Sequence, residues 1–104
     1  MKLTETRDDA IIVVGVACIP ADGVDAFVAY ERKVLSPLPE HGGELRLRFR
    51  GDAGGIEVHV LAFGSASDFA RYRNDPRRSG YGPLLEASGA QTSAYELRVA
   101  PLAI

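Results

Sequence analysis

The 104-residue chain has no tryptophan, a single cysteine and only two histidines. One thiol cannot form an intramolecular disulfide, and a chain without disulfides suits a reducing compartment, so we expect a cytoplasmic protein. Cys18 lies in an apolar segment with no base near it in sequence. We therefore expect it to be a small buried side chain rather than a nucleophile.

Neither sign of charge dominates, and long hydrophobic runs are missing. Twelve basic and 14 acidic residues give a formal net charge of −2. The arginines alternate with apolar residues or are mixed with acids, so we expect neither nucleic acid nor a membrane surface as a partner. No segment approaches the ~20 apolar residues that span a bilayer. Residues 1–9 form a polar lead without the apolar core of a signal peptide, and we expect one domain over residues 10–104.

The most informative segment that is present runs from Ile11 to Ile19 and reads Ile-Ile-Val-Val-Gly-Val-Ala-Cys-Ile. It is apolar on both faces, and each face of a buried strand needs its own cover. The sequence offers two amphipathic helices, which is enough to cover one side of a small sheet. A second copy of the chain is the economical cover for the other side, so we expect a homodimer through the open sheet face.

Hydrophobic spacing and capping residues predict the helices. Asp22 and Ser65 are expected N-caps, and glycines at 42–43 and 89 are expected to end helical segments. The expected helical segments span about 22–36, 65–72 and 83–88, with a break at Asn74-Asp75-Pro76.

Alternating patterns predict the remaining strands, which span 44–50, 56–63 and 92–102. The glycine-rich stretch 51–55 is a hairpin turn, and Pro101 suits a strand end or a sheet edge. The resulting order, β-α-β-β-α-β, predicts an α+β ferredoxin-like fold with a four-stranded antiparallel sheet and helices on one face.

Matching apolar with apolar side chains predicts the hairpin register, since a slip by one residue would exchange the two faces. The predicted pairs are Phe49–Ile56, Leu47–Val58, Leu45–Val60, Arg48–Glu57 and Arg46–His59, with a loop of even length. We expect the helices to cover the Leu/Val/Ile face. The open face then carries Arg46, Arg48, Glu57, His59, Leu61 and Phe63, and two such faces would enclose a small-molecule cavity.

The string Glu-His-Gly-Gly-Glu-Leu at 40–45, the element order and the length resemble the dimeric α+β barrel superfamily. The likeness runs from Ala10 to about Leu102 and is closest to the branch called domain of unknown function 1330. It implies two chains packed sheet against sheet. Members of the superfamily include cofactor-free monooxygenases, lactone isomerases, haem-degrading enzymes and ligand-sensing domains, so fold alone does not give function. Haem degradation in the superfamily uses an Asn, Trp and His set, which a chain without tryptophan lacks, and we expect no cofactor.

His59 is the candidate catalytic residue. Facing Arg46 across the hairpin, it is expected to be held neutral by the nearby positive charge and to accept a proton. Arg46 and Arg48 are candidate ligand-binding residues, because a guanidinium fits a carboxylate, enolate or phenolate. The plainer alternative is an ordinary interface in which Arg48 pairs with Glu57 and Arg46 meets an acid of the other subunit.

Tyr72 and Tyr81 are further candidate ligand-binding residues, each able to donate a phenolic hydrogen bond at a cavity mouth. The spacing of Tyr72 from Phe69 fits a core position equally well. Segment 74–82 is interpreted as a surface loop or a lid. Two histidines without suitably spaced carboxylates or thiolates give no reason to expect a metal site.

These observations favour a small-molecule-binding homodimer, with its pocket between sheet and helices or at the centre of the barrel. A cofactor-free monooxygenase or isomerase acting on an aromatic or enolic substrate is the leading interpretation, with His59 as the base. The alternatives are a non-catalytic binding or interaction module, and a structural protein whose polar interface only sets the dimer register.

Overall fold

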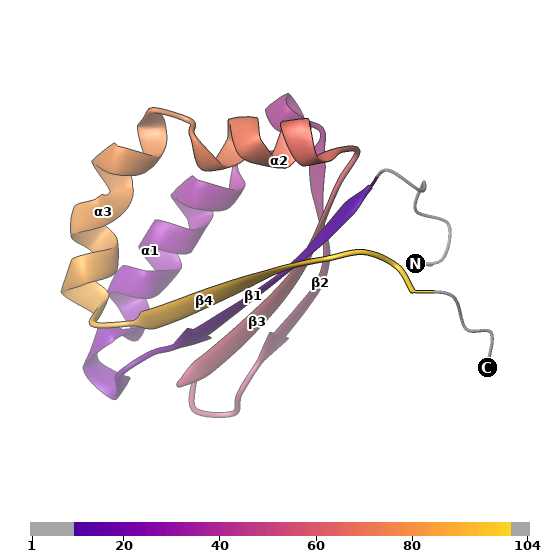
Figure 1. The fold of residues 1–104 in the computed structure, drawn as a ribbon. Coiled ribbons are helices and arrows are strands. Elements are labelled where there is room, and N and C mark those ends of the chain that lie inside the picture. Colours follow the sequence, from indigo (N-terminus) through magenta and orange to yellow (C-terminus); the bar gives the residue numbers. More distant parts are fainter. Residues whose placement is uncertain (1–9, 101–104) are drawn as a thin grey trace.

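The computed structural model describes residues 10–100 of the chain. Four antiparallel strands form one sheet in the order β2-β3-β1-β4, with the helices on one side of it (Figure 1). The strands are β1 (Ile11–Cys18), β2 (Gly43–Arg50), β3 (Ile56–Phe63) and β4 (Gln91–Leu97). The helices are α1 (Val24–Leu35), α2 (Ala66–Arg73) and α3 (Arg77–Ser88), with 3₁₀ turns η2 (Ala21–Gly23) and η3 (Leu38–His41). The predicted α+β ferredoxin-like fold is confirmed.

Several local signals act as predicted. The hydroxyl of Ser65 accepts a hydrogen bond from the backbone N–H of Asp68 at 3.1 Å and so caps α2. Gly42, at φ 67°, ends η3, and Gly89, at φ 68°, ends α3, both in the left-handed region that favours glycine. Within residues 10–100, no helix has the length and apolar content to cross a membrane.

The start of α1 differs from the prediction. Asp22 lies within η2 and caps nothing, and α1 begins at Val24 after Gly23, without a side-chain cap. Packing against α3 determines where α1 begins, because a Cβ on Gly23 would lie only 1.8 Å from the carbonyl oxygen of Ser88. Close contact between η2 and the end of α3 therefore sets the position of the helix.

Helix α3 is longer than the sequence predicted, and segment 74–82 is mostly helix rather than a loop or lid. Glycines at 80 and 82 and the proline at 83 lower its intrinsic helix propensity. A buried side chain compensates at its start, because Asp75 Oδ1 accepts the backbone N–H of Arg77 at 2.9 Å. At the other end of the chain β4 stops at Leu97, and the expected strand end at 101–102 lies outside the described residues, as does the polar lead 1–9.

The β2–β3 hairpin pairs apolar with apolar side chains, but two residues away from the predicted register. The observed pairs are Phe49–Val58, Leu47–Val60, Arg48–His59 and Arg50–Glu57. The N–H of Gly51 donates to the carbonyl of Ile56 at 2.9 Å, which leaves a four-residue loop, even as predicted. A shift by two keeps the side chains of residues 47–50 on their predicted faces, whereas Leu45 pairs with Leu61 instead of Val60 and so changes face. An unpredicted bulge at Arg46 takes that residue out of the ladder, so the expected Arg46–His59 pair is wrong.

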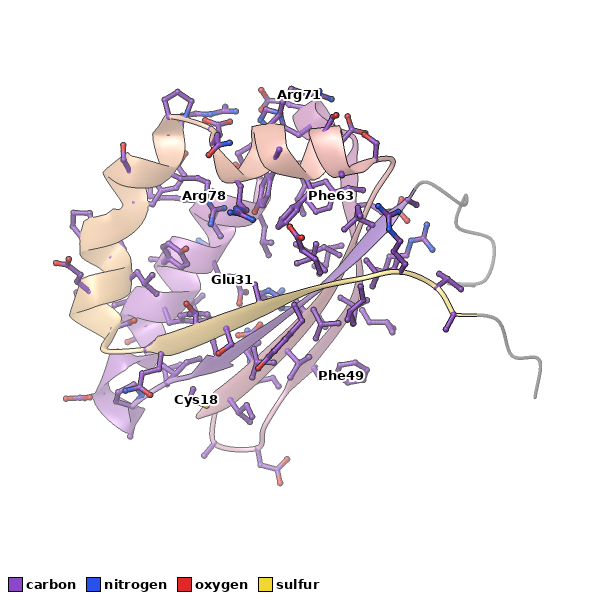
Figure 2. All side chains as sticks on the ribbon, viewed as in Figure 1. Cys18, Glu31, Phe49, Phe63, Arg71 and Arg78 are labelled. Carbon is purple, nitrogen blue, oxygen red and sulfur yellow. The ribbon has the colours of Figure 1, made fainter. Side chains whose placement is uncertain are left out.

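The helices cover the sheet face opposite to the one we predicted. Glu57 and Phe63 are buried beneath them, whereas Phe49 is 55% exposed and Ile56 45% exposed. Figure 2 shows Phe63 between helices and sheet and Phe49 on the far side. Aromatic packing selects this arrangement, because the Phe63 ring lies 5.1 Å from that of Phe69 in α2.

The face turned away from the helices is called the open face, and it is mainly apolar. Its apolar members, by strand register, are Ile12, Val14, Val16, Leu47, Phe49, Ile56, Val58, Val60, Ala62, Tyr95 and Leu97, and the polar residues Glu44, Gln91 and Ser93 lie towards its edges. Cys18 lies at the exposed end of β1 rather than in the core, because it occupies the last position of the strand on this same face. The two apolar sides of β1 therefore face different environments: one side lies beneath the helices and the other lies on the open face.

Candidate active site

A pocket of about 380 Å³ lies between the sheet and the helices. Its walls are mainly apolar, with side chains from β1, β3, α1 and α2, and three residues of β4 complete its rim. The polar lining groups include Glu31, Glu57, His59, Tyr30, Tyr72, Arg73 and Arg78. Apolar walls with a few convergent polar groups are typical of small-molecule sites.

His59 lines this pocket together with two buried carboxylates. Its Nε2 lies 3.1 Å from Glu57 Oε1, two residues away on β3, and 3.0 Å from Glu31 Oε2 on α1. Both glutamates are only 2% exposed. Because ionised carboxylates only accept hydrogen bonds, Nε2 must carry the ring proton, and Nδ1 is left as the basic nitrogen.

Two arginines of β2 hold the carboxylates. Arg48 pairs with Glu31, and its Nε donates to Glu57 Oε1 at 2.7 Å. Arg50 Nη2 lies 3.3 Å from both oxygens of Glu57. Burial alone would raise the pKa of Glu57, but hydrogen bonds from Arg48, His59 and Arg50 outweigh it and lower the pKa. Glu57 is therefore ionised at neutral pH.

One oxygen of this cluster stays without a hydrogen bond. Glu31 Oε2 is buried and, among the described residues, accepts none. It is close to His59, but the single N–H at Nε2 points to Glu57 and cannot serve both carboxylates.

The same three side chains are of metal-ligating types. Ligand atoms of Glu31, Glu57 and His59 all lie within 4.8 Å of one another. The sequence argument found no carboxylates placed to join a histidine, whereas the fold supplies two. Both are already paired with Arg48 and Arg50, so a cation would have to displace a guanidinium charge. The donor set therefore fits proton transfer better than metal binding.

Of the four predicted ligand-binding residues, Tyr72 alone is among those that line the pocket. Tyr72 lines the pocket, and its hydroxyl donates to the Val34 carbonyl at 2.5 Å, while burial raises its pKa against the opposing effect of Arg78. Arg48 is not among the lining residues and instead pairs with Glu31 and Glu57. Arg46 and Tyr81 are not among the lining residues, and Arg46 Nε lies 2.5 Å from Glu44 Oε1.

Sequence reasoning missed Glu31. The residue follows Phe27 by four positions and precedes Val34 by three, so it lies on the apolar stripe of α1. A charge inside a buried stripe is a signal for an interior polar site, since such a charge is buried only with partners.

Sheet order and helices on one face of the sheet define an α+β fold with ferredoxin-like element order, and a pocket lies beneath the helices. No protein-family profile matches the chain, and no curated protein matches its sequence. Solved structures do match it, at identities that show the fold alone. The branch suggested by the 40–45 string stays a prediction.

Three of these structures illustrate the fold. SnoaB of Streptomyces nogalater, a cofactor-independent oxygenase, is 14% identical with a TM-score of 0.68 over 89% of this chain and 95% of its own. A candidate antibiotic biosynthesis monooxygenase of Caulobacter crescentus is 10% identical with a TM-score of 0.75 over 94% and 96%. A NIPSNAP-like protein of Burkholderia xenovorans is 17% identical with a TM-score of 0.65 over 94% and 91%.

Proposed function

We propose that the pocket binds a small aromatic or enolic molecule and that His59 removes a proton from it in a cofactor-free oxygenation or isomerisation. The supporting observation is the His59 ring in an apolar pocket with its Nε2 next to two carboxylates. Histidine is the side chain that proteins use most often as a general base. SnoaB, which shares this fold, is a cofactor-independent oxygenase, and this agrees with the proposed chemistry. A shared fold does not by itself assign a function to this chain.

The reaction needs only the substrate, dioxygen and the base. Loss of a proton from a phenol or enol gives an electron-rich anion that can transfer electrons to O₂. A ring methylene and one O₂ then become a carbonyl and one water, so the atoms and electrons balance without a cofactor. Return of the proton to another carbon of the same anion gives isomerisation. Both routes share the first step, in which His59 Nδ1 accepts the proton.

We also propose that the active unit is a homodimer in which two open faces pack together. Leu47, Phe49, Ile56, Tyr95 and Leu97 are large apolar side chains exposed on this face. A contiguous apolar surface of this kind marks an interaction site rather than a solvated surface. A second copy is the complementary partner, since an isologous contact matches the same apolar patch on each chain.

The test of catalysis is oxygen consumption and product formation with a panel of phenols, hydroquinones and enols, in wild type and in His59→Asn. Loss of a general base is expected to lower kcat by about 10²- to 10⁴-fold, while ligand Kd changes little. His41→Asn is the matched control, because His41 is not among the pocket-lining residues. Binding of panel compounds without any turnover would assign a binding module instead, and turnover unaffected by His59→Asn would refute the role of His59.

A further inference from the structure

Two arginines line the pocket and differ in their partners. Arg73 of α2 donates from Nη1 to Glu96 Oε1 on β4 at 3.3 Å, so its charge is compensated. Arg78 of α3 lies over the Tyr72 ring, with its guanidinium carbon 5.0 Å from the ring centroid. Among residues 10–100, no carboxylate lies at ion-pair distance from Arg78.

The side chain of Arg78 lies toward the pocket. Figure 2 shows Arg78 on the sheet side of the helices, where the pocket lies, and Arg71 on the outer side. At the floor, Glu31 and Glu57 are matched by two arginines, so that cluster carries no excess charge when His59 is neutral. When the partners outside the lining (Arg48, Arg50 and Glu96) are counted with the lining residues, one positive charge remains, and Arg78 carries it.

We propose that Arg78 binds the carboxylate of an aromatic acid, with the ring of the acid lying in the apolar part of the pocket. A guanidinium offers two parallel N–H donors that match a carboxylate. A single guanidinium without a carboxylate partner suits a monoanion better than a phosphate dianion. The half-buried guanidinium of Arg78 lies beside Tyr72 without a carboxylate partner among the described residues, and a ligand carboxylate would supply one. This inference rests on the proposed function, since it names the substrate class of the same pocket.

The test compares pairs of ligands that share a shape and differ in charge. The probes are 4-hydroxybenzoate with 4-hydroxybenzamide, and 1-hydroxy-2-naphthoate with 1-hydroxy-2-naphthamide, titrated at pH 7 by calorimetry. We expect wild type to prefer each acid over its amide by about 10- to 100-fold, the range of a hydrogen bond to a charged group. Arg78→Gln is expected to remove the preference, and Arg78→Lys to keep part of it. Arg71→Gln, on the outer side of α2, is the matched control.

Each outcome decides between named possibilities. Equal affinity of wild type for acid and amide, or an equal loss of both in Arg78→Gln, would overturn the carboxylate site and leave the proposed function standing. Failure of every phenol, acid and amide to bind wild type would overturn both. The ratio of acid affinity to amide affinity in wild type, and its fall with added salt, test the inference even if Arg78→Gln does not fold.

Discussion

At the scale of single residues, three buried carboxylates are each held by at least one arginine. Glu31 and Glu57 are held by arginines beside His59 and line the pocket. Asp75, also buried, accepts hydrogen bonds from Arg77 and from His41 Nε2 at 2.9 Å, away from the pocket. The first pair supports chemistry at His59, and Asp75 fastens the start of α3 to η3.

Asp75 gives a prediction of acid sensitivity. Hydrogen bonds from Arg77 and then His41 hold its pKa well below the usual range. A carboxyl with a lowered folded-state pKa contributes stability above its ordinary pKa, near 4, and loses it as the pH falls. We expect the melting temperature of wild type to fall between pH 5 and pH 3. Asp75→Asn should melt lower at pH 7 and show a flatter decline over that interval, and a parallel decline in both proteins would contradict the assignment.

At the scale of elements, the approach of η2 to α3 sets the helical layer. A Cβ at Gly23 would lie 1.8 Å from the backbone oxygen of Ser88, so Gly23→Ala must displace one segment. We expect a loss of about 1–3 kcal/mol in the free energy of unfolding, measured with urea. Gly80→Ala is the control within α3, because a Cβ there meets nothing within 4 Å. It should gain about 0.5–1 kcal/mol from helix propensity, and a loss similar to that of Gly23→Ala would refute the packing argument.

At the scale of the whole molecule, the open face predicts association. Phe49 is 55% exposed on it, so an aspartate there costs the single chain little but places a charge inside a dimer interface. We expect light scattering at 10 µM (on the order of typical assay concentrations) to report twice 11.2 kDa for wild type and 11.2 kDa for Phe49→Asp. Ser67→Asp, exposed at the start of α2, should remain dimeric. A wild type of 11.2 kDa would end the dimer proposal.

The sequence by itself determined the element order and most turns, because periodicity, capping residues and glycines act locally. Strand β1 with two apolar faces, the Ser65 cap and the glycine ends at 42 and 89 are of this kind. The buried face of the sheet was decided only by the tertiary structure. Both faces of the hairpin alternate regularly, and the choice depended on aromatic packing of Phe63 against α2.

The candidate site likewise has one part that the sequence predicted and another that depends on the fold. His59 and its strand neighbour Glu57 were placed on one face from the sequence, whereas Glu31 comes from α1 by helix packing, and the bulge in β2 removes Arg46 from the position opposite His59. Contacts between residues 28 positions apart, as from Glu31 to His59, depend on how a helix packs on a sheet, and no local pattern encodes that packing. The chain determined which chemical groups are available, and the fold determined which of them meet.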